Sequence, residues 1–443
     1  MALTKASFSM ITGAYFNVLD FGADSTGATD STAAFQAAIE AAQLSARPVY
    51  IPAGFYLITD TLNVYNGTQI TGDTNFSYGQ GFGRQVYATT ITFTPATAKP
   101  LFDYSWKTAP SPGPVFHTSL ENLFLTATDP TKATFGLKLQ NVIFANYKNL
   151  TFENFDVGIY CRNTINNRFE NCFISDAANV CVYYVGEAET TDVWEQCTFF
   201  GSPVGVRFNG PAVGVRFDNC LWEQIVSYGM DISSRCQSIM VTNAYCEDVP
   251  YGASPPADGC MFRVGQVSGD SAADIQNHLL VIGGQFNGRN AGIAGAGLFS
   301  VNFCWGIYAG GFAANRWPYI INTDATNTNP NSIVLGGYQG IGWSNNIDDL
   351  TKVCGIYPNG VLNTGSFSEV SKFSTVTATS QIVVSGTGGY VNFGDRIWVV
   401  NGGSPEGLVT AFIGSLYSRT DGNTSTSLYV KEFGDGNTGW VGK

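Results

Sequence analysis

The chain has 443 residues, of which 13% are charged and 14% aromatic, and its formal net charge is −12 at pH 7. A net negative surface argues against nucleic acid as a partner. The lack of an apolar run of about 18 residues argues against membrane insertion, and the opening stretch MALTKASFSMITGAYF lacks the apolar core of a signal peptide.

A helix is predicted shortly after the first loop. Asp30 is a good N-cap residue, and Phe35, Ala38, Ile39 and Ala42 repeat at helical spacing until Pro48 interrupts the pattern. We expect this amphipathic helix to cap the β-structure that follows, because an uncapped end would expose apolar core and unpaired strand edges.

The run NVLDFGADSTGATDSTAAFQAAIEAA, followed by VYIPAGFYLITDTLNV and TQITGD, resembles the N-terminal signature of the pectate-lyase-like β-helix superfamily. The lead KASFSMITGA resembles that of bacteriophage tailspike depolymerases. The resemblance implies a homotrimer in the virion tail, assembled in the host cytoplasm and active outside the cell. It would bind and cleave bacterial surface polysaccharide, either capsule or O-antigen, and would contact other tail proteins. Since no particle-binding domain precedes KASFSMITGA, attachment is expected through a few N-terminal residues or another tail protein, unless the chain begins late.

One short pattern returns between Leu120 and Val249. An amide recurs at steps of 27, 22, 25, 23 and 24 residues, and the next position is small or apolar. The amide column is Asn122, Asn149, Asn171, Gln196, Asn219 and Asn243, and the column after it is Leu123, Leu150, Cys172, Cys197, Cys220 and Ala244. A repeat of this length, rich in β-branched and aromatic residues, predicts stacked coils.

The amide column predicts a tight corner between two strands of each coil. Asn tolerates the left-handed conformation that such a corner needs, and stacked side-chain amides can bond to one another. The apolar positions on both sides fit two short strands meeting at a bend, whereas a helix would give another period. The fold class predicted is therefore all-β, a right-handed parallel β-helix built as a single-stranded solenoid.

The repeat is looser on both sides of this region. Residues 73–118 are interpreted as an early coil that carries a long surface loop, rich in proline from Pro110 to Pro114. After the break at YGASPPADGC, the pairs Gly283–Gly284, Gly310–Gly311 and Gly336–Gly337 are expected to replace the Asn corner, because glycine reaches positive φ without strain.

Three regions are predicted from these patterns. Residues 1–72 hold the lead, the capping helix and the first coil, residues 73–365 form the β-helix body, and residues 366–443 form a small β-rich module. That module resembles one found at the C-terminal ends of phage virion proteins. It is interpreted as a trimerisation element, with a carbohydrate-binding tip as the alternative.

The ten cysteines show no CxxC pair and no Cys/His spacing typical of a metal site. Cys161, Cys172, Cys181, Cys197, Cys220, Cys246 and Cys260 lie in apolar surroundings, so we expect buried free thiols and folding in a reducing compartment. No cofactor and no metal are expected.

Carboxylates remain as candidate catalytic groups, because the two histidines lie outside the shared columns and GxSxG is absent. Four positions after the amide, Glu223 and Glu247 share a register on consecutive coils, with Asp248 beside Glu247 and Asp176 two coils earlier. Such a pair suits glycoside hydrolysis, which needs one proton donor and one base or nucleophile. Glu195 and Asp218 are second-choice candidates.

Aromatic and basic residues nearby are candidates for substrate binding. Flat rings can stack on sugars, and arginines can bind acidic sugars; the candidates are Trp222, Tyr245, Tyr228, Tyr251, Arg207 and Arg216. Three alternatives stay open: Glu223 and Glu247 as plain exposed turn residues, Arg207 and Arg216 as ordinary surface residues, and a site between subunits. A polysaccharide lyase and a non-catalytic receptor-binding fibre remain alternatives to the hydrolase.

Overall fold

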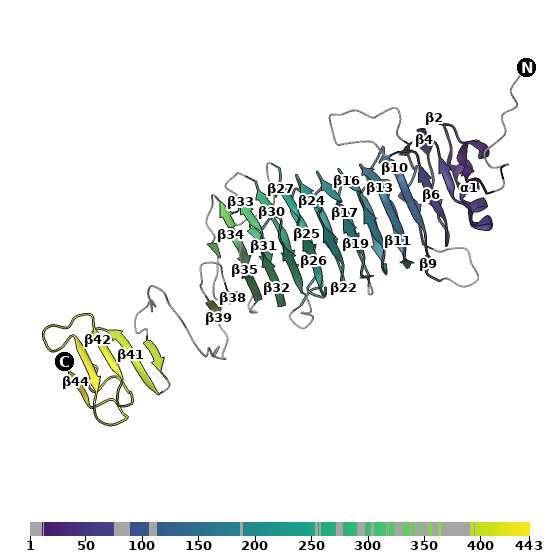
Figure 1. The fold of residues 1–443 in the computed structure, drawn as a ribbon. Coiled ribbons are helices and arrows are strands. Elements are labelled where there is room, and N and C mark those ends of the chain that lie inside the picture. The colour runs from purple at the N-terminus through teal and green to yellow at the C-terminus, as the bar shows by residue number, and fades with distance from the viewer. Residues whose placement is uncertain are drawn as a thin grey trace, which may run out of the picture. The chain divides into compact units, whose positions relative to one another are not determined.

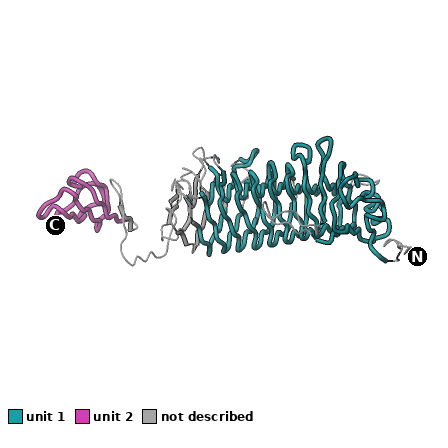
Figure 2. Tube along the Cα trace, turned by 90° about the horizontal axis from the view of Figure 1, so that it is seen from above, with its two compact units in different colours: residues 1–370 teal, residues 371–443 magenta. Residues whose placement is uncertain are grey.

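The computed structural model describes residues 11, 13–74, 89–105, 113–186, 189–252, 256, 258–271, 278–289, 297–302, 305–315, 317, 319–323, 331–336, 339–341, 346–347, 353–356, 362–364, 390–393 and 395–443. Two compact units divide the chain, residues 1–370 and residues 371–443 (Figure 2). The boundary predicted at residues 365 and 366 lies outside the described residues, as do much of the surface loop predicted within 73–118 and part of the Pro110–Pro114 stretch.

The predicted helix is α1, Thr32–Ser45, and lies at the N-terminal end of the first unit (Figure 1). Its buried face contains Phe35, Ala38, Ile39 and Ala42, as predicted. The predicted N-cap is wrong by one position: Ser31 is the N-cap, while Asp30 ends strand β2. The Asp30 carboxylate instead accepts hydrogen bonds from the backbone N–H and the hydroxyl of Thr32.

The first unit is a parallel β-helix whose coils stack along its length (Figures 1 and 2). A 24-stranded sheet, here the large sheet, takes two strands from most coils. Its strands are β1 Phe16–Asn17, β2 Thr26–Asp30, β3 Val49–Ile51, β4 Gly54–Ile58, β6 Gln69–Gly72, β7 Thr89–Phe93, β10 Ser119–Ala127, β13 Asn146–Glu153, β15 Arg168–Glu170, β16 Phe173–Ser175, β19 Val193–Glu195, β20 Thr198–Phe200, β23 Arg216–Asp218, β24 Leu221–Glu223, β26 Ile239–Thr242, β27 Tyr245–Val249, β29 Leu279–Ile282, β30 Gln285–Gly288, β32 Trp305–Gly310, β33 Ala313–Asn315, β35 Asn331–Gly336, β36 Gln339–Ile341, β38 Val353–Ile356 and β39 Leu362–Thr364.

An 11-stranded sheet, here the second sheet, takes one strand from each coil. Its strands are β5 Leu62–Asn63, β8 Lys99–Asp103, β11 Ala133–Gln140, β14 Val157–Arg162, β17 Val180–Tyr184, β21 Val204–Phe208, β25 Tyr228–Ile232, β28 Cys260–Val264, β31 Gly297–Val301, β34 Tyr319–Thr323 and β37 Asn346–Ile347. Two short pairs complete the coils, β9 Val115–Phe116 with β12 Val142–Ile143, and β18 Glu189–Thr190 with β22 Ala212–Val213.

The amide column forms the predicted corner. All six amide residues have positive φ, between 49° and 61°. Asn149 donates a hydrogen bond to the Asn122 side chain and accepts one from Asn171, both at 2.8 Å. Gly283 and Gly311, which follow Asn243 in the same register, also have positive φ, so glycine does replace the amide there.

The core lies inside the coils and is lined by the predicted inward columns. The residues two before the amide, Leu120, Tyr147, Phe169, Trp194, Phe217 and Val241, are all fully buried. The rings of Phe169 and Trp194 stack with centroids 3.8 Å apart. The seven cysteines predicted to be buried are buried and free.

The second unit contains a five-stranded sheet built from β40 Tyr390–Phe393, β41 Arg396–Asn401, β42 Leu416–Arg419, β43 Leu428–Lys431 and β44 Trp440–Gly442. Its small core consists of Val399, Ala411, Tyr417 and Trp440. Within the described residues, α1 is the one α-helix, and no helix there could cross a bilayer.

Candidate functional site

Glu223 and Glu247 lie side by side on the outside of the large sheet. They are Cα partners in the parallel ladder between β24 and β27, which is the register that the repeat spacing predicts. Phe200 precedes them and Asn287 follows them in the same column. Neighbouring strands in a sheet lie about 4.8 Å apart, so the two carboxyl-bearing positions are one strand spacing from each other.

The two glutamates have different surroundings. Glu223 is half-buried and Glu247 is exposed. Burial, followed by the negative charges of Glu247 and Asp248, raises the pKa of Glu223. The Tyr245 hydroxyl donates a hydrogen bond to Glu247 Oε2 at 3.1 Å, and Asn287 Nδ2 donates to that hydroxyl at 3.3 Å. The first carboxyl is therefore favoured as a proton donor, and the second is oriented by a tyrosine.

Asp248 and Asp176 occupy a second corner that the sequence did not reveal. In the column five after the amide, Asn154, Asp176, Gly201, Gln224 and Asp248 have positive φ, whereas Ala127 on the first of these coils still belongs to strand β10. This column therefore turns the chain from the large sheet toward the second sheet, and Asn, Asp and Gly recur there because they tolerate this conformation. Burial, and then the charge of Glu153, raises the pKa of Asp176.

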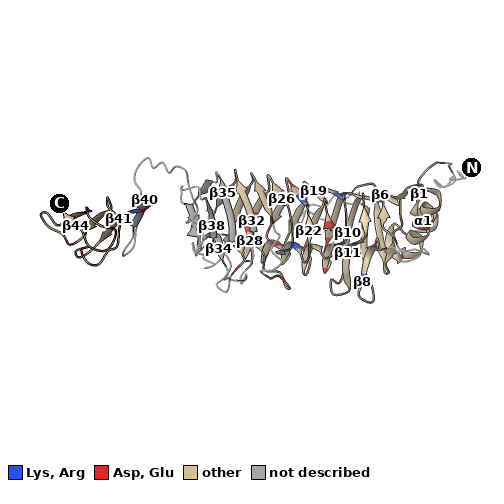
Figure 3. Cartoon of the chain, turned by 90° about the horizontal axis from the view of Figure 1, so that it is seen from below, with Lys and Arg blue, Asp and Glu red and all other residues tan. Residues whose placement is uncertain are grey.

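Glu195, Asp218 and Arg216 lie on the other strand of their coils, beyond the Asn corner from Glu223. Glu195 and Asp218 are Cα partners in one charged column of the large sheet, and Arg216 lies two residues before Asp218 on the same strand. Figure 3 marks the acidic and basic residues of the chain. Glu195 forms an ion pair with Arg168, and Arg216 Nη2 lies 2.5 Å from Asp218 Oδ2. Lys148 and Glu170 pair in the same column at 2.7 Å. These contacts give the column a structural role as a ladder of half-buried ion pairs.

Two of the aromatic candidates are not available for stacking on a sugar. Trp222 is fully buried, because its position in β24 points into the core, so the prediction for Trp222 is wrong. The prediction for Tyr228 is also wrong: its side chain is 8% exposed, and the Arg263 guanidinium covers its ring at 3.7 Å. Tyr251 is half-buried beneath the guanidinium of Arg289, 4.6 Å from its centroid. Tyr245, which is 37% exposed, lies beside the glutamates.

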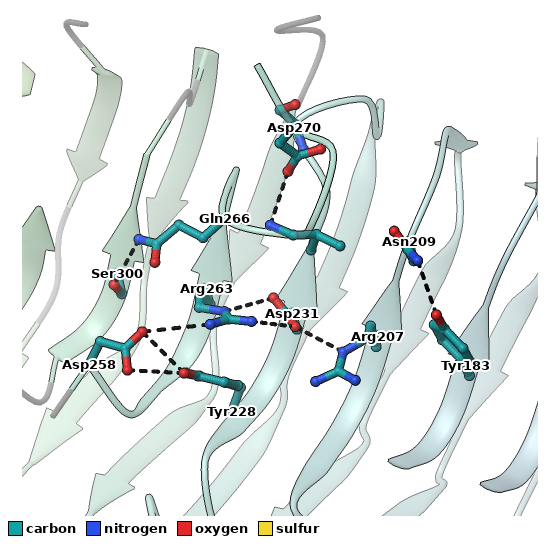
Figure 4. A network of polar contacts seen from close by, with 12 residues as sticks. Tyr183, Arg207, Asn209, Tyr228, Asp231, Asp258, Arg263, Gln266, Asp270 and Ser300 are labelled. Carbon is teal, nitrogen blue, oxygen red and sulfur yellow. Dashed lines mark hydrogen bonds and ion pairs between the residues drawn. The ribbon is translucent and has the colours of Figure 1, made fainter. Parts of the chain in front are cut away.

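Arg207 belongs to a polar network on the outside of the second sheet (Figure 4). Asp231, 1% exposed, accepts hydrogen bonds from Arg207 Nε at 3.0 Å and from Arg263 Nη2 at 2.8 Å. Tyr228 donates to Asp258 at 3.0 Å in the same network. Sequence reasoning missed Asp231 and Arg263, because the break at YGASPPADGC shifts the repeat between their coils.

A hollow of about 610 Å³ lies at the N-terminal end of the second sheet. Lys138 Nζ there contacts the buried Asp103 at 3.2 Å, and Lys99 pairs with Asp60 at 2.7 Å. The other lining residues are Thr61, Asn63, Val64, Tyr65, Ala98, Pro100 and Ser105. Among the described residues, no group of three or more His, Cys, Asp or Glu side chains is placed to hold a metal.

Comparisons with known proteins match the fold. Residues 15–231 match the family model described as rhamnogalacturonase A/epimerase, pectate lyase-like. The chain is 31% identical over 152 residues to depolymerase 1, capsule K3-specific, of Klebsiella phage KP32, covering 33% of this chain and 17% of that protein. It is 42% identical over 72 residues to a mannuronan C5-epimerase of Azotobacter vinelandii, covering 16% of this chain. The matched stretches thus span only 17% and 4% of these two relatives.

Solved structures agree at the level of the fold. A double-mutant form of the tailspike protein of E. coli bacteriophage HK620 superposes with a TM-score of 0.57 at 12% identity, covering 80% of this chain and 66% of that one. Another double-mutant form of that tailspike, in complex with a pentasaccharide, gives a TM-score of 0.56 at 12% identity and covers 78% of this chain and 66% of that one.

Proposed function

Because this chain is a pectate-lyase-like parallel β-helix protein with the fold of phage tailspikes, we propose that it is a tailspike that binds and hydrolyses bacterial surface polysaccharide. The named relatives include a capsule depolymerase and a tailspike solved with a pentasaccharide. The substrate proposed is capsule or O-antigen, cut within the chain rather than from its end. In this proposal the protein is part of the virion tail.

The observation that carries the proposal is the pairing of Glu223 with Glu247. The two residues are Cα partners on consecutive coils. The raised pKa of Glu223 favours this residue as the proton donor of the pair. Two carboxyl groups with different environments are the arrangement that glycosidases use for acid and nucleophile or base. The partial burial of Glu223 supports its role as the acid, and the contact with Tyr245 supports Glu247 as the nucleophile.

Glu223 acts as the general acid and Glu247 as the nucleophile. Glu223 gives its proton to the glycosidic oxygen as the bond to the anomeric carbon breaks, and Glu247 bonds to that carbon. Water, deprotonated by Glu223, then releases the sugar and restores both carboxyl groups. A strand spacing of about 4.8 Å is close to the roughly 5–5.5 Å separation of retaining enzymes, so the products should keep the anomeric configuration.

Tyr245 provides the sugar contact beside this pair. Its ring is 37% exposed, and its hydroxyl bridges Glu247 and Asn287. Gln285 extends the polar row, since its Nε2 donates to Asn287 at 3.3 Å. Gln285 follows Tyr245 on the next coil, and Asn287 follows Glu247. These amide and hydroxyl groups suit the hydroxyl groups of a polymer that follows the β-helix axis. Self-association as a homotrimer and contacts with other tail proteins belong to the same proposal.

The function is tested by incubating the protein with a panel of purified capsular and O-antigen polysaccharides and analysing the products by mass spectrometry. Fragments that have gained one water each support hydrolysis. Unsaturated ends would instead identify a lyase, and a polymer that is bound but never shortened would identify a non-catalytic receptor-binding protein.

A further inference from the structure

The hollow at the N-terminal end of the second sheet has no part in the chemistry proposed for Glu223 and Glu247. Its volume of about 610 Å³ is typical of a small-molecule binding site, since such sites usually measure about 300–1,000 Å³. Asn63, Asp103 and Lys138 line it from β5, β8 and β11. They are partners in one column on the outside of the second sheet, whereas the two glutamates belong to the large sheet. The hollow is therefore a separate site.

Donors and acceptors of hydrogen bonds both line the hollow. Lys99 Nζ donates to Asp60 Oδ1 at 2.7 Å. Lys138 Nζ donates to Asp103 Oδ2 at 3.2 Å and to Ser105 Oγ at 3.3 Å. An ammonium group has three N–H donors, so both lysines can donate to a ligand as well. The side chain of Asp60 is 56% exposed, so its carboxylate can accept from a ligand.

Asn63 offers the hollow a side-chain amide that the protein does not use. Its backbone N–H donates to Gln36 Oε1 at 2.9 Å, and its backbone carbonyl accepts from Gln36 Nε2 at 3.4 Å. Its side-chain amide has no hydrogen-bond partner among the residues that the structure describes. An amide both donates and accepts, so Asn63 can bind a hydroxyl group of a ligand without giving up a contact within the protein.

The charges of the hollow favour a neutral ligand. Its four charged side chains form two ion pairs, Lys99 with Asp60 and Lys138 with Asp103, so their charges cancel. The chain as a whole has a net charge of −12, which disfavours a polyanion. The hydrogen bond from Lys99 is the main reason why the pKa of Asp60 is lowered, so Asp60 stays ionised and is not a proton donor. These groups are suited to binding a sugar rather than to cleaving one.

Two tyrosines extend the column of Lys138 along the β-helix. Lys138 is partnered by Tyr160 on β14, which is partnered by Tyr183 on β17. Both rings are half-buried, and their centroids lie 6.2 Å apart. Each coil adds about 4.8 Å along the axis, so a polymer that leaves the hollow in this direction passes over one ring on each of two coils. A tyrosine ring combines an apolar face with a hydroxyl group, which suits a sugar.

We propose that the hollow and the rings of Tyr160 and Tyr183 form a second, non-catalytic binding site for polysaccharide, specific for neutral sugar units. Sugar hydroxyl groups both donate and accept hydrogen bonds, as the groups in the hollow do. This site takes the class of polymer that the protein is proposed to cleave, so its ligand rests on the proposed function. Four coil steps, roughly 19 Å, separate β11 from β25, the strand that follows the Glu223 strand β24. Substitutions in the hollow should therefore change binding and leave the chemistry at Glu223 unchanged.

The test measures the binding of neutral hexasaccharides of glucose, galactose and mannose to the full-length protein by isothermal titration calorimetry, with hexagalacturonate as the acidic comparison. Asn63→Leu fills part of the hollow with an apolar side chain and removes the unused amide. Asn146→Leu is the matched control, because Asn146 is exposed on β13 of the large sheet. We expect at least one neutral hexasaccharide to bind, Asn63→Leu to weaken its binding about tenfold, and Asn146→Leu to have no effect. Tyr183→Ala should also weaken binding, and thermal unfolding verifies that each variant is folded.

Three results would overturn the second site: no binding of any of the neutral hexasaccharides, binding of hexagalacturonate alone, or unchanged affinity in folded Asn63→Leu. Glu223→Gln separates this site from the proposed hydrolysis, and it should bind the same hexasaccharide as tightly as the unmodified protein. Weaker binding by Glu223→Gln but not by Asn63→Leu would place the ligand at the glutamate pair and also overturn the second site. Binding that depends on Asn63 in a protein that cleaves no polysaccharide would contradict the proposed function and support the second site.

Discussion

Glu223 and Glu247 are direct partners in the ladder between β24 and β27, although a full coil of chain separates them in sequence. Two ionised carboxylates at this spacing repel each other, and the partial burial of Glu223 disfavours its charged form further. Burial and the like charge on the next coil thus both raise the pKa of Glu223.

Replacing Glu223 by Gln removes the proposed proton donor without changing the shape of the side chain. We expect kcat on a cleavable polysaccharide to fall by a factor of about 10²–10⁴, the usual contribution of a general acid. The control is Glu170→Gln, which removes a carboxylate from the charged column, where Glu170 pairs with Lys148. Retention of full activity by Glu223→Gln would exclude Glu223 as the acid.

The pH dependence of cleavage should report the same group. Activity requires protonated Glu223, so it should fall as pH rises through the raised pKa of Glu223. The charge of Asp248 contributes to that raised pKa, and Asn tolerates the corner conformation of Asp248. Asp248→Asn should therefore move the alkaline limb of the kcat profile to lower pH. If the alkaline limb does not shift in Asp248→Asn, it reports the ionisation of a group other than Glu223.

Glu223→Gln should also make the protein more stable at neutral pH. A carboxyl whose pKa is higher in the folded than in the unfolded state opposes folding once it is ionised, and this penalty is absent at a pH below both pKa values. The thermal midpoint of Glu223→Gln should exceed that of the unmodified protein at pH 7, and the difference should vanish at about pH 3. A lower midpoint at pH 7 would contradict the raised pKa of Glu223.

The Asn corner is predicted to contribute stability rather than chemistry. Asn149→Ala replaces a residue that tolerates the left-handed conformation by one that does not. It also removes the bonds to Asn122 and Asn171, and the two effects together should cost about 2–5 kcal/mol. Asn149→Gly loses the same bonds but tolerates positive φ, so its loss should be smaller. Thermal or denaturant unfolding compares the two variants. Equal losses would show that backbone conformation does not contribute at this corner.

Trp222 and Tyr245 lie on the neighbouring strands β24 and β27 but should respond in opposite ways to substitution. Trp222→Leu leaves a cavity in the core and should lower the thermal midpoint. Tyr245→Leu removes an exposed ring and the hydrogen bond to Glu247, so it should weaken cleavage while leaving the midpoint nearly unchanged. Kinetics and thermal unfolding of both variants distinguish a core residue from a substrate-binding one. If Tyr245→Leu lowered the thermal midpoint and Trp222→Leu did not, the two roles would be contradicted.

The fold could be predicted from the sequence because each coil repeats the same local requirement. Asn149 and the other amides of its column have positive φ, and Cys172, Cys197 and Cys220 are buried inside the coils. The spacing of these columns therefore predicts the register of β24 and β27. The prediction that Trp222 stacks on a sugar was wrong, because the same spacing places this side chain in the core. The contact between Asp231 and Arg263 could not be predicted from the spacing, because an irregular insertion separates their coils. The second corner at Asp176 and Asp248 was missed because its residues vary more than the amides do.

Hydrolysis by Glu223 is tested by digesting a susceptible capsular or O-antigen polysaccharide in ¹⁸O-labelled water with the unmodified protein and with Glu223→Gln. Mass spectrometry of the products reads both the reaction type and the residue that performs it. We expect fragments that each carry one ¹⁸O from the unmodified protein and almost no fragments from Glu223→Gln. Fragments with unsaturated ends and no ¹⁸O, or equal cleavage by the two proteins, would contradict it.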